Sequence, residues 1–339
     1  MDLLDIKQYL LHQFKSEADL VAAIELISHN FTKDRSELST YLKDERLVSA
    51  YTYFYLSTNM PKLASVLGYL GKEFSDFNDY EFVDIGTGPG TFLLSLLEHL
   101  PHNNYYGIEV SQLMLKQADK LVSGFYPKAS VTLTSSLKEI PKKCMKRIGL
   151  FSHSANEMNP EQVLNYIDKL DLDEVLFIEP GIKDFFKKSL EIRDHLIQQK
   201  YHVHYPCHSN GSCPLGDDDW CHQFIKITHS PEVQRLCQLV RKDRSLLPLT
   251  IQYYAKEAKT KTSVNRVVRT FKPTKFSIEM QLCHGIENEN KLIHLQQLTR
   301  NLDKQQIKKF SSIHAGEEIS FDVVKELPNN VVRGDIHES

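Results

Sequence analysis

A short apolar run that leads directly into three alternating glycines constrains the fold more than any other feature. The residues from Phe82 to Ile85 have the pattern of a buried strand, and Gly86-Thr87-Gly88-Pro89-Gly90 follows before the apolar start of a helix. Glycine lets the backbone turn tightly and approach a ligand, and the first turn of the next helix leaves N–H groups unpaired. This order of strand, turn and helix predicts an α/β protein with a binding site at the turn.

Short apolar runs alternate with amphipathic stretches through the middle of the chain. The runs cover residues 82–85, 105–108, 131–133, 148–151 and 175–178. Alternation of this kind is typical of a parallel sheet covered by helices. We therefore expect an α/β unit of at least five strands.

Three regions can be distinguished along the chain. Residues 1–75 have apolar positions at helical spacing, which predicts an N-terminal helical region. Residues 76–255 contain the predicted sheet and a loop at 206–222 that is rich in Cys, His, Gly and Asp. Residues 256–339 contain strand-like runs, which predict a small, basic, β-rich C-terminal extension.

The near-neutral charge balance argues against a protein that coats nucleic acid without specificity. The chain has 41 Lys and Arg against 44 Asp and Glu, whereas such coating needs a large cationic field. One local basic stretch is a candidate for phosphate contacts, with a solvated surface as the alternative. Its cations are Lys256, Lys259, Lys261, Arg266, Arg269, Lys272 and Lys275.

The cellular location is predicted from the absence of targeting patterns. No apolar run approaches the roughly 20 residues that a membrane helix needs. The sequence begins Met1-Asp2-Leu3-Leu4-Asp5, without the basic segment of a signal or transit peptide. Six cysteines in a chain of this length do not require a disulfide framework. We expect a cytoplasmic protein with reduced thiols and no membrane partner.

Two carboxylates near the glycine turn indicate which ligand it holds. The pattern D-x-G-x-G-x-G resembles the loop of S-adenosylmethionine methyltransferases, and its members are Asp84, Gly86, Gly88 and Gly90. In this position Asp84 is available to the methionine ammonium. Glu109 ends the second predicted strand, where an acid can accept both ribose hydroxyls. We predict that these five residues bind S-adenosylmethionine as a cofactor.

The sequence does not identify a catalytic residue. The fourth predicted strand leads into a segment with His153, Asn156 and Glu157, at the sheet edge that faces the methyl donor in this fold. The Asn/Asp-Pro-Pro-aromatic motif of amino-group methyltransferases is missing here, and no cysteine nucleophile occurs between Cys144 and Cys207. For each of the three side chains, lining the site and packing behind it are equally open.

Three cysteines fall in the turn-rich loop at 206–222, namely Cys207, Cys213 and Cys221. The glycines and proline of this loop let it fold back so that three thiolates converge. Thiolates select zinc or iron–sulfur clusters over hard cations. The spacing is not that of a C-x-x-C ribbon, so zinc and iron both stay open, with free thiols as the alternative.

Residues 47–298 resemble the methyltransferase-like ribosome assembly proteins of the mitochondrial small ribosomal subunit and their bacterial relatives. The stretches that carry the resemblance are Ala50 to Pro61, the glycine turn, Ile178-Glu179-Pro180-Gly181 and, above all, Pro206 to His222. The resemblance implies a class I S-adenosylmethionine methyltransferase fold with a Rossmann-like sheet. It also implies association with small-subunit rRNA or a ribosomal subunit precursor, and a 4Fe-4S cluster held by four cysteines.

The resemblance also assigns the ligands of that cluster. The first three fall on Cys207, Cys213 and Cys221, and the fourth falls on Cys283, in a predicted strand of the C-terminal extension. Cys144 and Cys237 are left as buried or free thiols.

Two main functions follow from these features. The first is an enzyme that methylates small-subunit rRNA, with the donor at the glycine turn and most of the rate supplied by proximity. The second is a non-catalytic assembly factor that binds rRNA and uses the cluster structurally. A weaker alternative is a small-molecule methyltransferase with a structural zinc loop. A fold and a cofactor do not by themselves distinguish the three.

Overall fold

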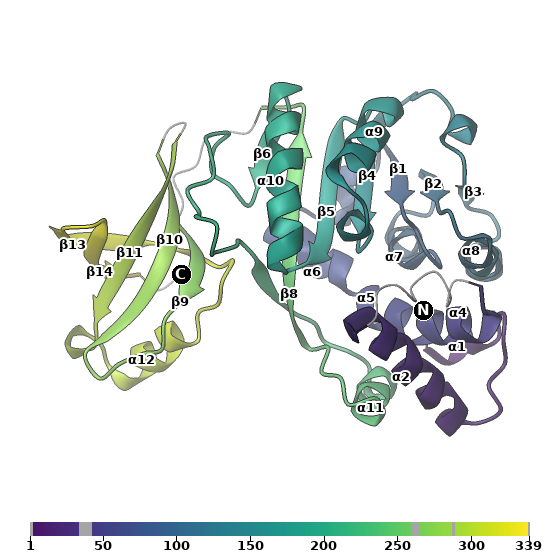
Figure 1. Cartoon of the computed structure of the whole chain (residues 1–339), viewed down its shortest axis with the longest axis horizontal. Helices are drawn as coiled ribbons and strands as arrows, with labels where there is room; N and C mark the ends of the chain where they lie inside the picture. Colours follow the sequence, from purple (N-terminus) through teal and green to yellow (C-terminus); the bar gives the residue numbers. More distant parts are fainter. Residues whose placement is uncertain (1–2, 34–42, 259–264, 287–288, 338–339) are drawn as a thin grey trace. The chain divides into compact units, whose positions relative to one another are not determined.

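The computed structural model describes residues 3–33, 43–258, 265–286 and 289–337. They belong to two compact units. The first unit comprises residues 1–158, 162–175 and 225–247, and the second comprises residues 159–161, 176–224 and 248–339. The helices and strands are labelled in Figure 1.

Short helices make up the N-terminal part of the first unit, as the sequence predicts. They are α1 (Leu3–Lys7), α2 (Glu17–Lys33), α4 (Glu45–Tyr51), the π-helix η2 (Thr52–Leu56), α5 (Ser57–Asn59), α6 (Lys62–Tyr69) and the 3-10 helix η3 (Phe74–Phe77). Apolar side chains at helical spacing on α2, such as Leu20 and Ile24, are buried. Asp44 caps α4, where its carboxylate accepts hydrogen bonds from the N–H groups of Arg46 and Leu47.

A parallel sheet with the strand order β3-β2-β1-β4 follows in the first unit. Its strands are β1 (Tyr80–Ile85), β2 (Asn104–Ile108), β3 (Ser130–Thr134) and β4 (Lys146–Ser152). Each strand contains one of the predicted apolar runs, which confirms the prediction for these four. Ile85 is in register with Ile108 and Phe151, so the carboxyl ends of β1, β2 and β4 meet at one edge.

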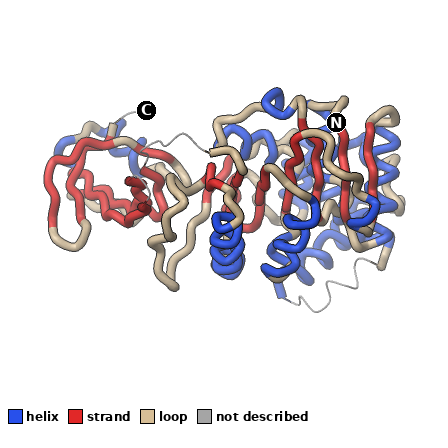
Figure 2. The backbone as a smooth tube through the Cα atoms, turned by 90° about the horizontal axis from the view of Figure 1, so that it is seen from above, coloured by secondary structure: helices blue, strands red, loops and turns tan. Residues whose placement is uncertain are grey.

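Helices follow three of these strands in the sequence. α7 (Thr91–His99) follows β1, α8 (Gln112–Phe125) follows β2 and α9 (Pro160–Leu170) follows β4, with the 3-10 turns η4 (Leu137–Glu139) and η5 (Ala155–Glu157). A further helix of this unit, α11 (Pro231–Leu239), comes much later in the chain. Figure 2 shows the helices in blue beside the strands in red. The residues of α7 from Thr91 to Leu97 are all buried, which explains why this stretch of the sequence is almost entirely apolar.

A buried ion pair joins two neighbouring strands of this sheet. The register puts Glu81 of β1 beside Arg147 of β4, whose Nε–H group donates to Oε1 of Glu81 at 2.7 Å. The other guanidinium nitrogens donate to the carbonyl groups of Pro141 and Leu170. Both charges are buried and paired, so removal of either partner would cost about 3–5 kcal/mol of stability.

The second unit contains three neighbouring strands, one long helix and a separate sheet. The neighbours are β5 (Glu174–Pro180), β8 (Leu246–Ala255) and β6 (His202–Tyr205), in that order, and the helix is α10 (Lys183–Gln198). β7 (Gln223–Lys226) pairs with β8. β5 contains the fifth predicted apolar run, which confirms that prediction as well.

The predicted β-rich C-terminal extension is a six-stranded sheet with the order β12-β9-β10-β11-β14-β13. Its elements are β9 (Asn265–Thr270), β10 (Ser277–Ile286), β11 (Glu289–Leu298), η6 (Thr299–Asn301), α12 (Lys304–Ser311), β12 (Glu318–Ile319), β13 (Phe321–Leu327) and β14 (Val331–Ile336). Val267, Ile278 and Leu295 of this sheet form one apolar core with Phe310 of α12. The α/β class with N-terminal helices and a β-rich extension is therefore confirmed.

Two further sequence predictions concern the whole chain. Within the described ranges, no helix is long and apolar enough to cross a bilayer. The division at residues 75 and 255 stays a prediction.

Candidate functional site

The turn between β1 and α7 requires glycine at two positions. Gly86 has a φ of 74°, and a Cβ placed on it would lie 2.4 Å from the Cβ of Ser154. Gly90 has a φ of 86° and is the N-cap of α7. These left-handed angles are ones that other residues rarely adopt. A larger residue at Gly86 would push the turn away from the segment that follows β4.

The carboxylate of Glu109, directly after β2, fixes the middle of the turn. Its Oε2 accepts a hydrogen bond from the N–H group of Gly88 at 3.0 Å, and its Oε1 accepts one from the N–H group of Ser111 at 2.9 Å. A carboxylate oxygen can accept two hydrogen bonds, so each oxygen keeps one place for a ligand. Glu109 therefore shapes the loop and remains able to bind.

Asp84 is a buried carboxyl group at the end of β1. Thr87 donates its hydroxyl proton to Oδ2 at 2.7 Å, whereas Oδ1 has no hydrogen-bond partner among the described residues. Burial raises the pKa of Asp84 to about 7 against the opposing hydrogen bond from Thr87, and the nearby charge of Glu109 raises it further. A cationic ligand group beside Oδ1 would stabilise the ionised form.

The turn and both carboxyl groups open onto one pocket of about 450 Å³ in the first unit. Four of the five residues predicted to bind the cofactor line it, namely Asp84, Gly86, Gly88 and Glu109. Gly90 is not among the lining residues, and its position packs against Ala118 of α8 instead. The geometry brings the four residues together, and their contact with a cofactor stays a prediction.

Another part of the pocket comes from residues that the sequence interpretation missed. Tyr51, which the aromatic run at residues 51–55 suggests is a core residue, lines the pocket together with Asn59. Burial, and then the charge of Glu157, raise the pKa of Tyr51, so its hydroxyl group keeps its proton at neutral pH. The π-helix η2 begins directly after Tyr51, and such irregular turns often occur at functional sites. A π-turn has no recognisable sequence pattern, so this signal is visible only in the structure.

The segment after β4 contributes a neutral histidine to the same pocket. His153 and Glu157 line the pocket, whereas Asn156 does not. Nζ of Lys62, a residue that is 1% exposed, lies 2.7 Å from Nε2 of His153. Burial, and then the charge of Lys62, lower the pKa of His153 well below its usual value. An ammonium group can only donate, so Nε2 accepts and the ring proton sits on Nδ1.

The four cysteines of the predicted metal site all belong to the second unit and influence one another electrostatically. Burial raises the pKa of Cys221 well above its usual value, and the charges of Cys207 and Cys283 add to the effect. Burial likewise raises the pKa of Cys283 to about 12, with further contributions from Cys207 and Cys213. None of the four forms a disulfide.

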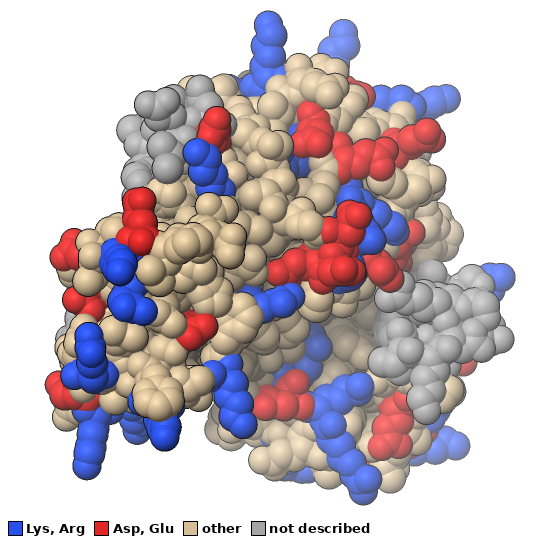
Figure 3. All heavy atoms as spheres, turned by 60° about the vertical axis from the view of Figure 1, so that its left-hand side comes forward, with Lys and Arg blue, Asp and Glu red and all other residues tan. Residues whose placement is uncertain are grey.

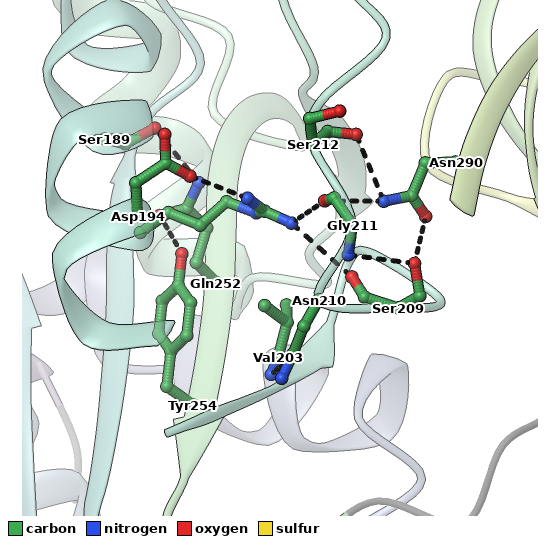
Figure 4. Close-up of polar contacts among 11 residues, drawn as sticks. Ser189, Asp194, Val203, Ser209, Asn210, Gly211, Ser212, Gln252, Tyr254 and Asn290 are labelled. Atoms are coloured by element: carbon green, nitrogen blue, oxygen red, sulfur yellow. Dashed lines mark hydrogen bonds and ion pairs between the residues drawn. The ribbon is translucent and has the colours of Figure 1, made fainter. Parts of the chain in front are cut away.

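A buried arginine from α10 holds the loop that carries the first two cysteines. Figure 4 labels the loop residues Ser209 and Gly211 and their neighbour Asn290. Arg193 is 2% exposed and donates through its NH2 nitrogen to the carbonyl groups of Ser209 and Gly211. Its Nε–H group has no hydrogen-bond partner among the described residues. Burial lowers the pKa of Arg193, but attraction to Cys207, Tyr254 and Asp194 together with a hydrogen bond to Cys207 outweighs this effect, and the net pKa is raised. Asn290 of β11 also donates to the Gly211 carbonyl, so the loop is held from two elements.

Partly buried thiols that share one neighbourhood and form no disulfide are the donor set that soft metals take. In the part of the chain that the structure describes, however, no group of three or more His, Cys, Asp or Glu side chains is arranged to hold a metal ion. Ligation of a 4Fe-4S cluster or of zinc by Cys207, Cys213, Cys221 and Cys283 therefore stays a prediction.

The basic stretch is not a uniform phosphate-binding surface. Arg266 is 4% exposed and donates to the carbonyl groups of Pro206 and Gly316 at 2.8 Å, so its predicted phosphate contact is wrong. The reason is that Arg266 lies on β9 and points into the unit, where it also pairs with Glu318. Lys259 and Lys261 lie outside the described residues.

The other cations of this stretch are exposed, although Arg269 pairs with Asp219 at 2.8 Å. On the face drawn in Figure 3, Lys and Arg side chains are interspersed with Asp and Glu.

The parallel sheet, the glycine turn and its carboxylates define an α/β protein with a nucleotide-type binding loop. The family described as mitochondrial small ribosomal subunit Rsm22 matches residues 45–303, and the chain belongs to this family. The resemblance drawn from residues 47–298 is thereby confirmed. No curated protein sequence matches the chain.

Solved structures of methyltransferases are similar to parts of the chain at low identity. Magnesium protoporphyrin IX methyltransferase (ChlM) from Synechocystis PCC 6803 with bound SAM is 13% identical, with a TM-score of 0.39 over 68% of this chain and 95% of that chain. The mitomycin 7-O-methyltransferase MmcR is 13% identical, with a TM-score of 0.41 over 71% of this chain and 67% of that chain. The plantazolicin methyltransferase BpumL in complex with SAH is 13% identical, with a TM-score of 0.36 over 71% and 97%.

Asp84→Asn is expected to stabilise the ligand-free protein at pH 8, by roughly 2–4 kcal/mol. The fold raises the pKa of Asp84 to about 7, so its ionisation opposes folding increasingly as the pH rises from about 4 through 7. Asn keeps an oxygen for the Thr87 hydroxyl and carries no charge. Urea unfolding at two pH values measures the effect, which should fall to about 1 kcal/mol or less at pH 4.5.

Asp79→Asn is the matched control, because Asp79 is an exposed acid just before β1. It should change the free energy of unfolding little at either pH. An equal effect of Asp84→Asn at both pH values would contradict the raised pKa.

Proposed function

We propose that this chain is a class I S-adenosylmethionine-dependent methyltransferase-like protein of the small ribosomal subunit. The observation that carries the proposal is the single pocket shared by the glycine turn, Asp84 and Glu109. The methyl donor, S-adenosylmethionine, carries a positive sulfonium and a positive ammonium group. Among its described lining residues the pocket has three carboxyl groups, those of Asp84, Glu109 and Glu157, and no Lys or Arg. This charge suits a cationic ligand.

Two of the three carboxyl groups, those of Glu109 and Asp84, have distinct roles in the proposed complex. Glu109 accepts the ribose hydroxyls with the lone pairs that Gly88 and Ser111 leave free. Oδ1 of Asp84 accepts from the methionine ammonium, which relieves the cost of burying an ionised carboxyl group. Tyr51 and His153 line the same pocket. Their O–H and N–H groups would donate hydrogen bonds to the molecule that receives the methyl group.

The partner and the second cofactor are part of the same proposal. The description of the family as a mitochondrial small ribosomal subunit protein supports association with that subunit and its rRNA. A 4Fe-4S cluster on Cys207, Cys213, Cys221 and Cys283 is supported by the resemblance and by the mutual electrostatic influence of these partly buried thiols. When bound, such a cluster would cross-link the loop to β10.

A second candidate is an assembly factor that binds the donor without transferring its methyl group. The observation in its favour is that no Lys or Arg is among the described residues lining the pocket, although contacts to the phosphates of an RNA substrate come mainly from cations. Incubation of the purified protein with radiolabelled donor and small-subunit rRNA separates the candidates. Label in the RNA supports the enzyme, and donor binding without transfer supports the factor.

Donor binding should depend strongly on Glu109. Glu109→Ala removes both the ribose acceptor and the bond that holds Gly88, so affinity for S-adenosylmethionine should fall by about 10- to 100-fold. Calorimetry on the full chain measures this. Glu25→Ala, an exposed change on α2, is the control and should bind as wild type does. Equal affinity of the Glu109 variant and wild type would refute the assignment.

Anaerobically purified protein should contain about four irons per chain. Cys283→Ser is expected to lose most of this iron, because it removes one of four ligands, whereas the exposed Cys144→Ser should keep it. Metal analysis of wild type, Cys283→Ser and Cys144→Ser measures the iron content of each protein. A folded preparation with one zinc and no iron would favour zinc, and full iron content in Cys283→Ser would remove this residue from the ligand set.

A further inference from the structure

A hollow beside the six-stranded sheet is lined by three cationic side chains and an exposed aromatic ring. The hollow has a volume of about 610 Å³ and lies entirely within the second unit. Lys275 and Phe276 come from the segment before β10, Arg300 from η6, and Arg333 from β14. Ile307 of α12 contributes an apolar floor.

Hydrogen bonds hold the backbone segment that carries the exposed ring of Phe276. Phe276 is 68% exposed, the second most exposed of the large apolar residues described. Its N–H group donates to the hydroxyl oxygen of Thr274 at 3.1 Å, and its carbonyl group accepts from the N–H group of Thr299 at 3.0 Å. The hydroxyl group of Thr299 also donates to the carbonyl group of Lys275 at 2.7 Å. These bonds fix the segment, so little backbone entropy is lost when a ligand contacts the ring.

The cations around the ring are available to an anion. Nζ of Lys275 lies 4.8 Å from the centroid of the Phe276 ring. Arg333 donates through Nε and NH2 to Oε1 of Gln296, a neutral partner, which orients the guanidinium group without neutralising it. Arg300 is exposed, and among the described residues that line the hollow there is no carboxyl group.

We propose that this hollow binds single-stranded RNA, with one base stacked on Phe276 and the neighbouring phosphates contacted by Lys275, Arg300 and Arg333. An exposed ring on a fixed backbone segment, with cations lining the same hollow, matches the two needs of such a ligand, because every base has a π-face and every nucleotide carries a phosphate. The alternative is a solvated surface that binds no RNA, since single exposed apolar side chains are common. The proposal rests on the rRNA association in the proposed function and gives it a location.

The test is binding of a labelled twelve-nucleotide oligouridylate to the full chain, followed by fluorescence anisotropy at several salt concentrations. Phe276→Ala should weaken binding by about 5- to 150-fold, which corresponds to about 1–3 kcal/mol for one stacked base. Phe276→Trp should restore binding, because an indole ring also stacks. Arg300→Gln should weaken binding and lower the log-log salt slope by about 0.7, because one phosphate fewer is neutralised.

Phe271→Ala is the matched control, because Phe271 belongs to the same segment, is 38% exposed, and rests against the ring of His294. It should bind as wild type does. If wild type binds the oligonucleotide and the Phe276 and Arg300 variants bind equally well, this location is wrong while RNA association stands. If wild type binds neither this oligonucleotide nor small-subunit rRNA, the RNA part of the proposed function fails. If polyglutamate displaces the labelled oligonucleotide as efficiently as unlabelled RNA does, and Phe276→Ala leaves oligonucleotide affinity unchanged, the proposal is also overturned.

Discussion

The hydrogen bonds of the Glu109 carboxylate hold the turn on which the candidate site depends. They tie the end of β2 to the N–H group of Gly88, while the missing Cβ of Gly86 lets the turn lie against Ser154, after β4. Three strand ends are thereby linked through one loop. Burial raises the pKa of Asp84, and the charge of Glu109 raises it further. Glu109 therefore contributes to both the geometry and the electrostatics of the pocket.

The parts of the fold that could be predicted are those set by local pattern. Buried parallel strands need consecutive apolar residues, so the runs in β1, β2, β4 and β5 were visible, whereas the partly exposed β3 offered only the short run at residues 131–133. The glycine turn was visible because Gly86, Gly88 and Gly90, all at left-handed φ angles, alternate in the sequence. Tyr51 and Lys62 could not be assigned to the site. Their positions depend on how the N-terminal helices pack, and an aromatic or a lysine on a helix has the same local pattern whether it is core, surface or pocket lining.

The basic stretch shows why charge counts fail at the level of single residues. Arg266 and Lys275 look alike in the sequence, but β-strand alternation turns Arg266 toward Pro206 and Gly316, while Lys275 stands before β10 in solvent. Buried arginines such as Arg193 and Arg266 need several backbone carbonyl groups from distant segments. No sequence window contains both partners, so these contacts are visible only after folding.

The central claim is that the pocket at the glycine turn binds the methyl donor, and hydrogen–deuterium exchange with and without S-adenosylhomocysteine tests it most directly. The product analogue should slow exchange in peptides that cover residues 84–92 and 107–112, because a ligand there orders the turn and the Glu109 segment. The six-stranded sheet should exchange at an unchanged rate. Protection elsewhere, or no protection at a saturating concentration, would contradict the claim.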